Sequence, residues 1–289
     1  MSYQTHFSAE PSPIAALAPG EAITLHTPSV LTRGDLPRTY DDLVIPVVGP
    51  VRVEGAQPGM TLSLSVSSIQ VASEGAMVAL PGYGAFGDLL DEPGGRVVPI
   101  RDGRCHLLEG VEFAVAPMVG KIGVAVPSSP PRSNTVGDHG GNMDCRQVGP
   151  GSTVLLPVQV EGALFYVGDA HARQGDGECL MTAVETEADV TIAANIHQGL
   201  DTRRPVILAS SGEVCIVGHG ESLDEASLDA LREARRLLSV AHGWSVADAA
   251  MMMSALADLH VCQIVNPRKS AHVAVPAQYL PQFAAVFAP

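Results

Sequence analysis

The hydrophobic period of this chain changes once, and that change sets the fold class. From residue 20 to about 210, apolar and polar residues alternate, as at Leu62, Leu64 and Val66 after a Pro-Gly turn. The 22 prolines and 29 glycines are spread along the chain, which is typical of many short strands joined by turns. The first part of the chain is therefore expected to be mainly β.

The pattern becomes helical towards the C-terminus. Ser222 and Glu225 have the spacing of a capping box, and apolar residues then recur at helical spacing. Gly243 suits a helix C-cap, and Ser245 is placed to start a second helix. A helix pair followed by a strand is the expected result.

Together these patterns predict an α+β, mainly β protein with sandwich-like or barrel-like sheets. Residues 1–215 would form the β-rich region that carries the functional site. Residues 216–289 would form a helical hairpin and a closing strand, packed on the same body. Residues 127–143 hold three prolines and three glycines and are expected to be a loop.

Charge and cysteine usage restrict the partners. The net charge of −14 argues against nucleic acid and anionic membranes, and it suits a small neutral or cationic substrate. The N-terminus does not resemble a secretory signal, and no apolar run reaches the roughly 18 residues of a membrane span. The five cysteines are far apart and form no CxxC pair, so we expect reduced thiols and a cytoplasmic protein.

Two short runs broken by glycine, residues 137–146 and 167–180, concentrate metal-binding side chains. Residues two apart in a strand share one face. The rule applies to Asp169 and His171 and to Asp176 and Glu178 in the later run, and to Asn142 and Asp144 in the earlier one. We predict that Asp144, Asp169 and His171 bind a divalent ion. This ligand set favours zinc, with manganese or calcium as alternatives. Such an ion would activate a water, and Glu178 is the candidate to take and return its proton.

Other interpretations of these residues stay open. Asp and Asn next to glycine are also ordinary turn formers. Cys145 could be a thiolate nucleophile, but its neighbour Asp144 disfavours the thiolate while Arg146 favours it, so we expect it to be inert. A GxSxG motif is missing, which leaves a serine nucleophile unsupported.

These residues also carry a family resemblance. The segments "HGGNMD" (139–144) and "LPVQVEGALFYVGDAHARQGDGE" (156–178) resemble the acetamidase/formamidase family. "GPVRVEGAQPGMTL", "PMVGKIGVA" and "ADLHVCQIVNP" are similar to its early, central and closing segments, so the resemblance covers most of the chain. It implies hydrolysis of a small aliphatic amide, a β-rich fold with some helix, a divalent metal and a homo-oligomer, which we take to be a homodimer.

The resemblance also has departures. A histidine is expected shortly before Gly49, where this chain has Ile45, and Asp138 stands where a proline is usual before His139. Cys145 replaces an aliphatic residue. These differences bear on substrate identity and activity more than on the fold.

The resulting hypothesis is a metal-dependent hydrolase of formamide-like or acetamide-like substrates. Catalytic roles are expected for Glu178 and His139, and substrate binding for Asn142, Gln174 and the backbone around Gly140 and Gly141. Two alternatives remain: a non-catalytic β-domain that binds a metal or small ligand, and a hydrolase of a related C–N bond.

Overall fold

The computed structural model describes residues 3–29, 31, 39 and 46–287. Its strands form two large sheets, antiparallel except for the parallel pair β2–β4. The 12-stranded sheet contains β1 (Tyr3–Gln4), β2 (Ala15–Leu17), β4 (Val47–Val53), β6 (Glu74–Ala79), β7 (Gly94–Arg101), β8 (Arg104–Leu108), β9 (Val111–Ala114), β10 (Met118–Val124), β11 (Val136–Gly137), β12 (Gly140–Asn142), β14 (Phe165–Arg173) and β15 (Val184–Glu185). The 8-stranded sheet contains β3 (Ala22–Thr27), β5 (Thr61–Val71), β13 (Thr153–Pro157), β16 (Ala188–His197), β17 (Val206–Leu208), β18 (Glu213–Gly220), β19 (Asp258–Gln263) and β20 (Lys269–Pro276).

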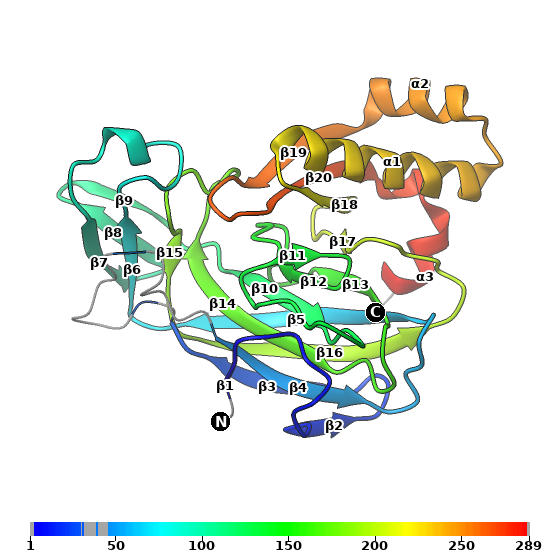
Figure 1. Cartoon of the computed structure of the whole chain (residues 1–289), viewed down its shortest axis with the longest axis horizontal. Coiled ribbons are helices and arrows are strands. Elements are labelled where there is room, and N and C mark those ends of the chain that lie inside the picture. The colour runs from blue at the N-terminus through cyan, green and yellow to red at the C-terminus, as the bar shows by residue number, and fades with distance from the viewer. Residues whose placement is uncertain (1–2, 30, 32–38, 40–45, 288–289) are drawn as a thin grey trace.

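The helices follow the second sheet. Helix α1 (Leu223–His242) and helix α2 (Val246–Leu256) lie over β18–β20 (Figure 1). Short 3-10 turns η2 (Gly87–Leu89), η3 (Ala277–Tyr279) and η4 (Pro281–Phe283) and helix α3 (Ala284–Phe287) complete the described elements. Among these helices, none is both long and apolar enough to cross a membrane.

Strand alternation divides the core into two layers. Cys215 and Val217 of β18 belong to the large cluster between the sheets, whereas Val214 and Ile216 belong to the cluster under α1. Successive side chains of a strand point to opposite faces, so the 8-stranded sheet is covered on both sides. This arrangement confirms the α+β, mainly β class and the C-terminal helix pair.

The local sequence signals for the helices are confirmed. The Ser222 hydroxyl accepts a hydrogen bond from Glu225 N at the start of α1, and Gly243 ends that helix in the left-handed conformation. Ser245 caps α2 by accepting from Asp248 N. The boundary expected at residue 215 falls inside β18, and because β18 pairs with β20, one sheet contains strands from both predicted regions.

The expectation that residues 127–143 form only a loop is wrong. This segment contains β11 and β12, which pair with each other, and β12 also pairs with β10. Gly140 and Gly141 have φ values of 87° and 85°, and a Cβ there would lie 2.4 and 2.3 Å from backbone oxygens. Only glycine lets the segment approach its neighbours this closely, so the same glycines that suggest a loop permit the strand pairing.

Candidate active site

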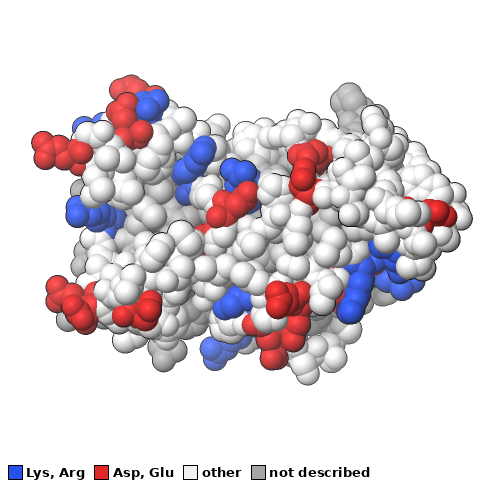
Figure 2. Space-filling model, turned by 90° about the horizontal axis from the view of Figure 1, so that it is seen from above, with Lys and Arg blue, Asp and Glu red and all other residues white. Residues whose placement is uncertain are grey.

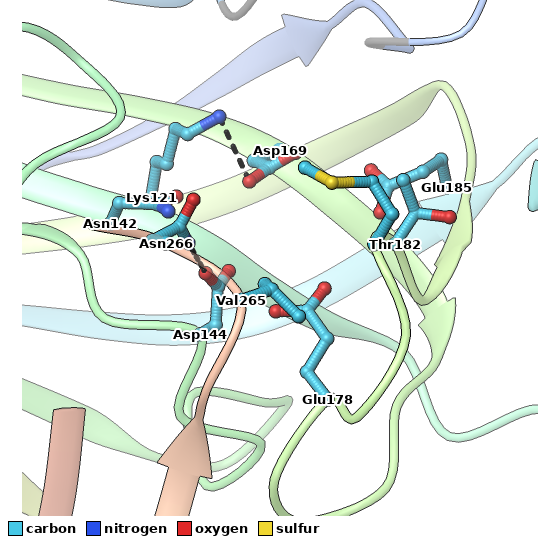
Figure 3. Close-up of a pocket in the computed structure, with 10 residues that line it drawn as sticks. Lys121, Asn142, Asp144, Asp169, Glu178, Thr182, Glu185, Val265 and Asn266 are labelled. Carbon is cyan, nitrogen blue, oxygen red and sulfur yellow. Dashed lines mark hydrogen bonds and ion pairs between the residues drawn. The ribbon is translucent and has the colours of Figure 1, made fainter. Parts of the chain in front are cut away.

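A small cavity brings the two polar runs of the sequence together. Its volume is about 40 Å³, against roughly 10–15 Å³ for a single water. Figure 3 shows carboxylates converging on it from separate segments of the chain. It is lined by Lys121, Asn142, Asp144, Asp169, Glu178, Met181, Thr182, Glu185, Val265 and Asn266.

Strand β14 supplies Asp169 and His171, and its hydrogen-bonded neighbour β10 has a glycine beside them. Asp169 has a left-handed φ of 61°. A Cβ on Gly120 of β10 would lie 2.4 Å from Asp144 Oδ1 and 3.0 Å from Asp169 Oδ2. The absence of a side chain at Gly120 therefore creates the space that the two carboxylates occupy.

Two further carboxylates reach the cavity through strained backbone. Asp144 and Glu178 have φ values of 46° and 37°. The turn before Glu178 is fixed because Gly177 N donates to Val261 O at 2.9 Å and to Cys262 O at 3.1 Å. A residue held in this region of φ costs about 1–3 kcal/mol, and such residues are concentrated at functional sites.

Gln174 fixes the orientation of His171. The carbonyl oxygen Oε1 of Gln174 lies 2.8 Å from His171 Nδ1, while Gln174 Nε2 donates to Asp144 O at 2.6 Å and Cys262 O at 3.4 Å. Since an amide oxygen only accepts, His171 Nδ1 carries the proton. The other nitrogen, Nε2, faces Glu185 Oε1 at 3.1 Å and Asp169 Oδ1 at 3.6 Å. Burial would lower the pKa of His171, but these two carboxylates outweigh it and raise the pKa well above its usual range. When a metal displaces the proton, Nε2 is the nitrogen that offers its lone pair.

The cavity carries an excess of negative charge. Lys121 Nζ lies 3.0 Å from Asp169 Oδ2, and both side chains are buried (Figure 3). Four lining carboxylates against one ammonium leave a net charge of −3 if all are ionised. Four buried oxygens of the cavity have no hydrogen-bond partner among the described residues: Asn142 Oδ1, Asp144 Oδ1, Glu178 Oε2 and Glu185 Oε2. Buried charge of one sign is costly unless a cation compensates it.

The pKa directions reflect this crowding. Burial and the Asp169 carboxylate raise the pKa of Asp144 to about 7. Burial and the Asp144 carboxylate raise the pKa of Glu178 well above its usual range, and burial raises that of Glu185. Burial would also raise the pKa of Asp169, but Lys121 and His171 outweigh it and hold this pKa well below its usual range.

The donors fit a divalent cation. Ligand atoms of Asp144, His171 and Glu178 lie within 4.8 Å of one another, and so do those of Asp169, His171 and Glu185. Each group combines carboxylate oxygens with one imidazole nitrogen, a donor set that accepts zinc or manganese. The two groups share His171 Nε2, because its other ring nitrogen is engaged with Gln174.

Comparison with known proteins agrees with this arrangement. A sequence model of the acetamidase/formamidase family matches residues 129–281, which include both polar runs. The chain belongs to the acetamidase/formamidase family. Its fold is similar to the crystal structure of an acetamidase from Bacillus halodurans, with a TM-score of 0.91, 32% identity and 97% of each chain covered. A predicted acetamidase/formamidase from Thermoanaerobacter tengcongensis gives a TM-score of 0.91 at 31% identity, covering 98% of this chain and 95% of that one.

Similarity to curated members of the family is local. A putative formamidase from Schizosaccharomyces pombe is 43% identical over 60 residues, which is 20% of this chain and 15% of that protein's length. The match therefore spans a small part of that relative. The family resemblance expected from the sequence is confirmed by the family model and by the two whole-chain structural matches.

The structure gathers most of the sequence-predicted site residues. Asn142, Asp144, Asp169 and Glu178 line the cavity, and His171 lies beside them. The three predicted metal ligands do not, however, make up one of the compact groups. Asp169 is paired with Lys121, and Gln174 contacts His171 without lining this cavity.

Three other predicted site residues lie elsewhere. The His139 ring packs against Phe7 with centroids 4.8 Å apart and does not line the cavity. Burial and the nearby His219 lower the pKa of His139 to about 4. Gly140 and Gly141 are paired with β10 and β11, so they act as strand residues.

Of the two departures from the family pattern next to Gly49 and His139, the structure describes only the second. Ile45 lies outside the described residues. Asp138 Oδ1 lies 2.8 Å from His219 Nε2 and 3.1 Å from Arg204 Nη1. Asp138 therefore joins the segment before β12 to β18 and to the chain leading into β17.

The sequence analysis did not predict several residues that line the cavity, although one of them stands out in the sequence. Lys121 is a single charged residue inside the apolar run of β10, whose residues are all buried. Glu185 is a buried acid of β15, and Asn266 donates from Nδ2 to Asp144 Oδ2 at 3.2 Å. An isolated lysine in an apolar strand indicates a buried ion pair, and could have drawn attention to Lys121.

Proposed function

We propose that this chain hydrolyses a small linear amide to a carboxylate and ammonia with the help of a divalent cation. The observation that carries the proposal is the buried cavity, where four carboxylates surround one oriented imidazole and leave polar atoms without partners. Family membership supports the reaction class. The small volume of the cavity favours formamide-like or acetamide-like substrates.

In this proposal the cation is held by Asp144, His171 and Glu178. Asp144 and Glu178 each have a buried oxygen without a hydrogen-bond partner, and the ligand atoms of all three residues form one compact group. When bound, a divalent cation supplies Lewis acidity toward the amide carbonyl and lowers the pKa of a nearby water. We propose zinc, because an imidazole is among the ligands; manganese and calcium are the alternatives.

Glu185 is then the residue that moves the proton. Its Oε2 is buried and without a partner among the described residues, and burial raises its pKa. A carboxyl whose pKa is raised exchanges protons closer to neutral pH. Glu185 would accept a proton from the attacking water and deliver it to the departing nitrogen. The sequence-based hypothesis gave this role to Glu178, which the geometry favours as a ligand.

Two polar residues and one positioning residue complete the proposed machinery. Asn142 presents its buried amide to the cavity, where it can orient the substrate by hydrogen bonding. Lys121 holds Asp169 ionised at the cavity wall and offsets part of its negative charge. Gln174 acts through His171, because its hydrogen bond sets which ring nitrogen faces the ligand group. His139 has no part in this mechanism.

Turnover and metal content together test the proposal. Ammonia release is measured for a panel of amides, from formamide to longer and urea-like compounds, with elemental analysis of the same samples. Glu185→Gln should keep the metal and lose at least ~100-fold in kcat, the scale of general acid–base catalysis. The matched control is Glu187→Gln, an exposed neighbour that should keep both.

Two outcomes would contradict the proposed reaction, and a third would exchange two of the proposed roles. Metal retention without ammonia from any amide would favour a non-catalytic binding domain. Turnover confined to urea-like or longer substrates would favour a related C–N hydrolase. Loss of metal in Glu185→Gln, with retention in Glu178→Gln, would exchange the roles given to these two residues.

The proposal extends to assembly and compartment. Apolar side chains of α2 and the adjacent β19 are exposed, with Val246 at 66%, Met251 at 64% and Leu259 at 49%. Exposed apolar groups of this kind support a homodimer that covers them. Light scattering tests this: the wild-type chain should have the molar mass of a dimer, and Met251→Glu that of a monomer. The free cysteines among the described residues support a reducing, cytoplasmic location.

A further inference from the structure

Three soft-metal donors meet in the core behind the candidate active site. Cys145 follows Asp144 directly, Cys262 lies in β19 and His272 lies in β20. All three are buried, at 0%, 1% and 0% exposure. None of them lines the cavity described above, so the proposed amide hydrolysis does not use them.

Their spacing matches that of ligands around one ion. His272 Nδ1 lies 3.6 Å from Cys145 Sγ and 3.2 Å from Cys262 Sγ, and the three donor atoms lie within 4.8 Å of one another. Zn–S bonds of about 2.3 Å and Zn–N bonds of about 2.0–2.1 Å at tetrahedral angles place sulfur and nitrogen about 3.6 Å apart. A cation therefore fits between these side chains with little movement.

Packing alone gives no reason for these residues. Cys145 and Cys262 belong to the apolar cluster between the sheets, where aliphatic side chains surround them. His272 Nε2 is buried and has no hydrogen-bond partner among the described residues, although its ring stacks on His260 at 4.9 Å. A buried imidazole nitrogen without a partner is costly in a core. The nitrogen that faces the two sulfurs is the other one, Nδ1, so this atom is the one available to a metal.

We infer that Cys145, Cys262 and His272 form a second metal site, which takes a thiophilic d¹⁰ cation such as Zn²⁺ or Cu⁺. Thiolate and imidazole donors select such ions, whereas the oxygen-rich cavity beside Asp144 also accepts harder ones. The ion would join the segment after β12 to β19 and β20, and so tie the two sheets together. Gln174 Nε2 contacts the carbonyls of both Asp144 and Cys262, which places this tie directly behind the first site.

Cadmium is a suitable probe because its bonds to thiolate sulfur absorb in the ultraviolet, whereas its bonds to carboxylates do not. The protein is stripped of metal in denaturant with a chelator and refolded with Cd²⁺. We expect one equivalent of Cd²⁺ to produce the sulfur-to-metal band in the wild-type chain. The band should be lost in Cys145→Ser and in Cys262→Ser, and kept in Cys105→Ser, a buried cysteine outside the cluster.

A second measurement keeps the test decisive if one serine variant folds poorly. Cd²⁺ should raise the thermal midpoint of Glu178→Gln, whose first site is impaired, and should leave that of Cys262→Ser/Glu178→Gln unchanged. The absence of a sulfur band in the refolded wild-type protein would overturn the inference. So would a disulfide between Cys145 and Cys262 in the isolated protein, identified by mass spectrometry of its unreduced peptides.

Discussion

Asp144→Asn tests the electrostatics of the candidate site through stability, without an activity assay. In the metal-free protein, burial and the Asp169 carboxylate raise the pKa of Asp144 from 3.8 to about 7. The folded-state pKa lies above the unfolded value, so the stabilisation is complete below pH 3.8 and is lost as the pH rises through about 7. At about 1.36 kcal/mol per pH unit, this loss amounts to about 4 kcal/mol.

The assay is urea unfolding of chelator-treated protein between about pH 4.5 and about pH 7.5. The free energy of unfolding of the wild-type chain should fall across this range, and Asp144→Asn should lose markedly less. Burial acts in the same direction on the pKa of Glu178, so part of the slope remains in the variant. Asp258→Asn, an exposed carboxylate of β19, should keep the full wild-type slope. Zn²⁺ should restore stability at neutral pH, because a cation compensates ionised carboxylates.

Two results would refute this reasoning. A flat pH dependence of the metal-free wild-type protein would mean that its carboxylates are not crowded in a buried site. An unchanged slope in Asp144→Asn would place the crowding elsewhere. A loss of about 4 kcal/mol is easily resolved, since the whole free energy of unfolding of a domain is about 5–15 kcal/mol.

Three further changes give distinct outcomes. Gly120→Ala places a Cβ 2.4 Å from Asp144 Oδ1 and should lower the metal content measured by elemental analysis. The control is Gly175→Ala, whose Cβ would have no atom within 4 Å and which should keep its metal. Equal metal content in the two variants would contradict the crowded geometry. Lys121→Met removes one partner of a buried ion pair and should cost about 3–5 kcal/mol in urea unfolding, and an unchanged midpoint would show that the pair is unimportant. Gln174→Leu frees the imidazole it orients and should weaken zinc binding about 10–100-fold by calorimetry; wild-type affinity would remove its positioning role.

Local signals in the sequence predicted much of the fold. The capping serines of α1 and α2 and the alternation along β5 depend on neighbours within a few residues, so the sequence alone can predict them. The short strands β11 and β12 were missed because β12 forms by pairing with β10, an earlier strand of the chain, and β11 then pairs with β12. Sheet partners of this kind are set by tertiary contacts.

In the site, too, local spacing predicted some features, and distant contacts determined the others. The two-residue spacing of Asp169 and His171 correctly indicated that both side chains face one site. The same rule fails for Asp176, which points to Arg146 at 2.7 Å while Glu178 enters the cavity. The cause is the left-handed backbone at Gly177 and Glu178, with φ values of 94° and 37°. Local sequence did not reveal it, because the turn is fixed by hydrogen bonds to β19.

The distribution of charged side chains on the surface also bears on binding to nucleic acid. On the face shown in Figure 2, most of the surface is uncharged, and acidic side chains lie beside several of the basic groups. The net charge of −14 opposes binding to the phosphate backbone of a nucleic acid. A small uncharged amide suits the molecule better.

The central claim is that the cavity beside Asp144, His171 and Glu178 holds a cation on which amide hydrolysis depends. The most direct measurement is ammonia release from acetamide and formamide by metal-free protein during titration with Mn²⁺, an ion that thiolate ligands bind weakly. The account predicts negligible release without metal, and activity that rises in proportion to occupancy up to one ion per chain. Full activity in protein shown by elemental analysis to be free of metal would contradict it.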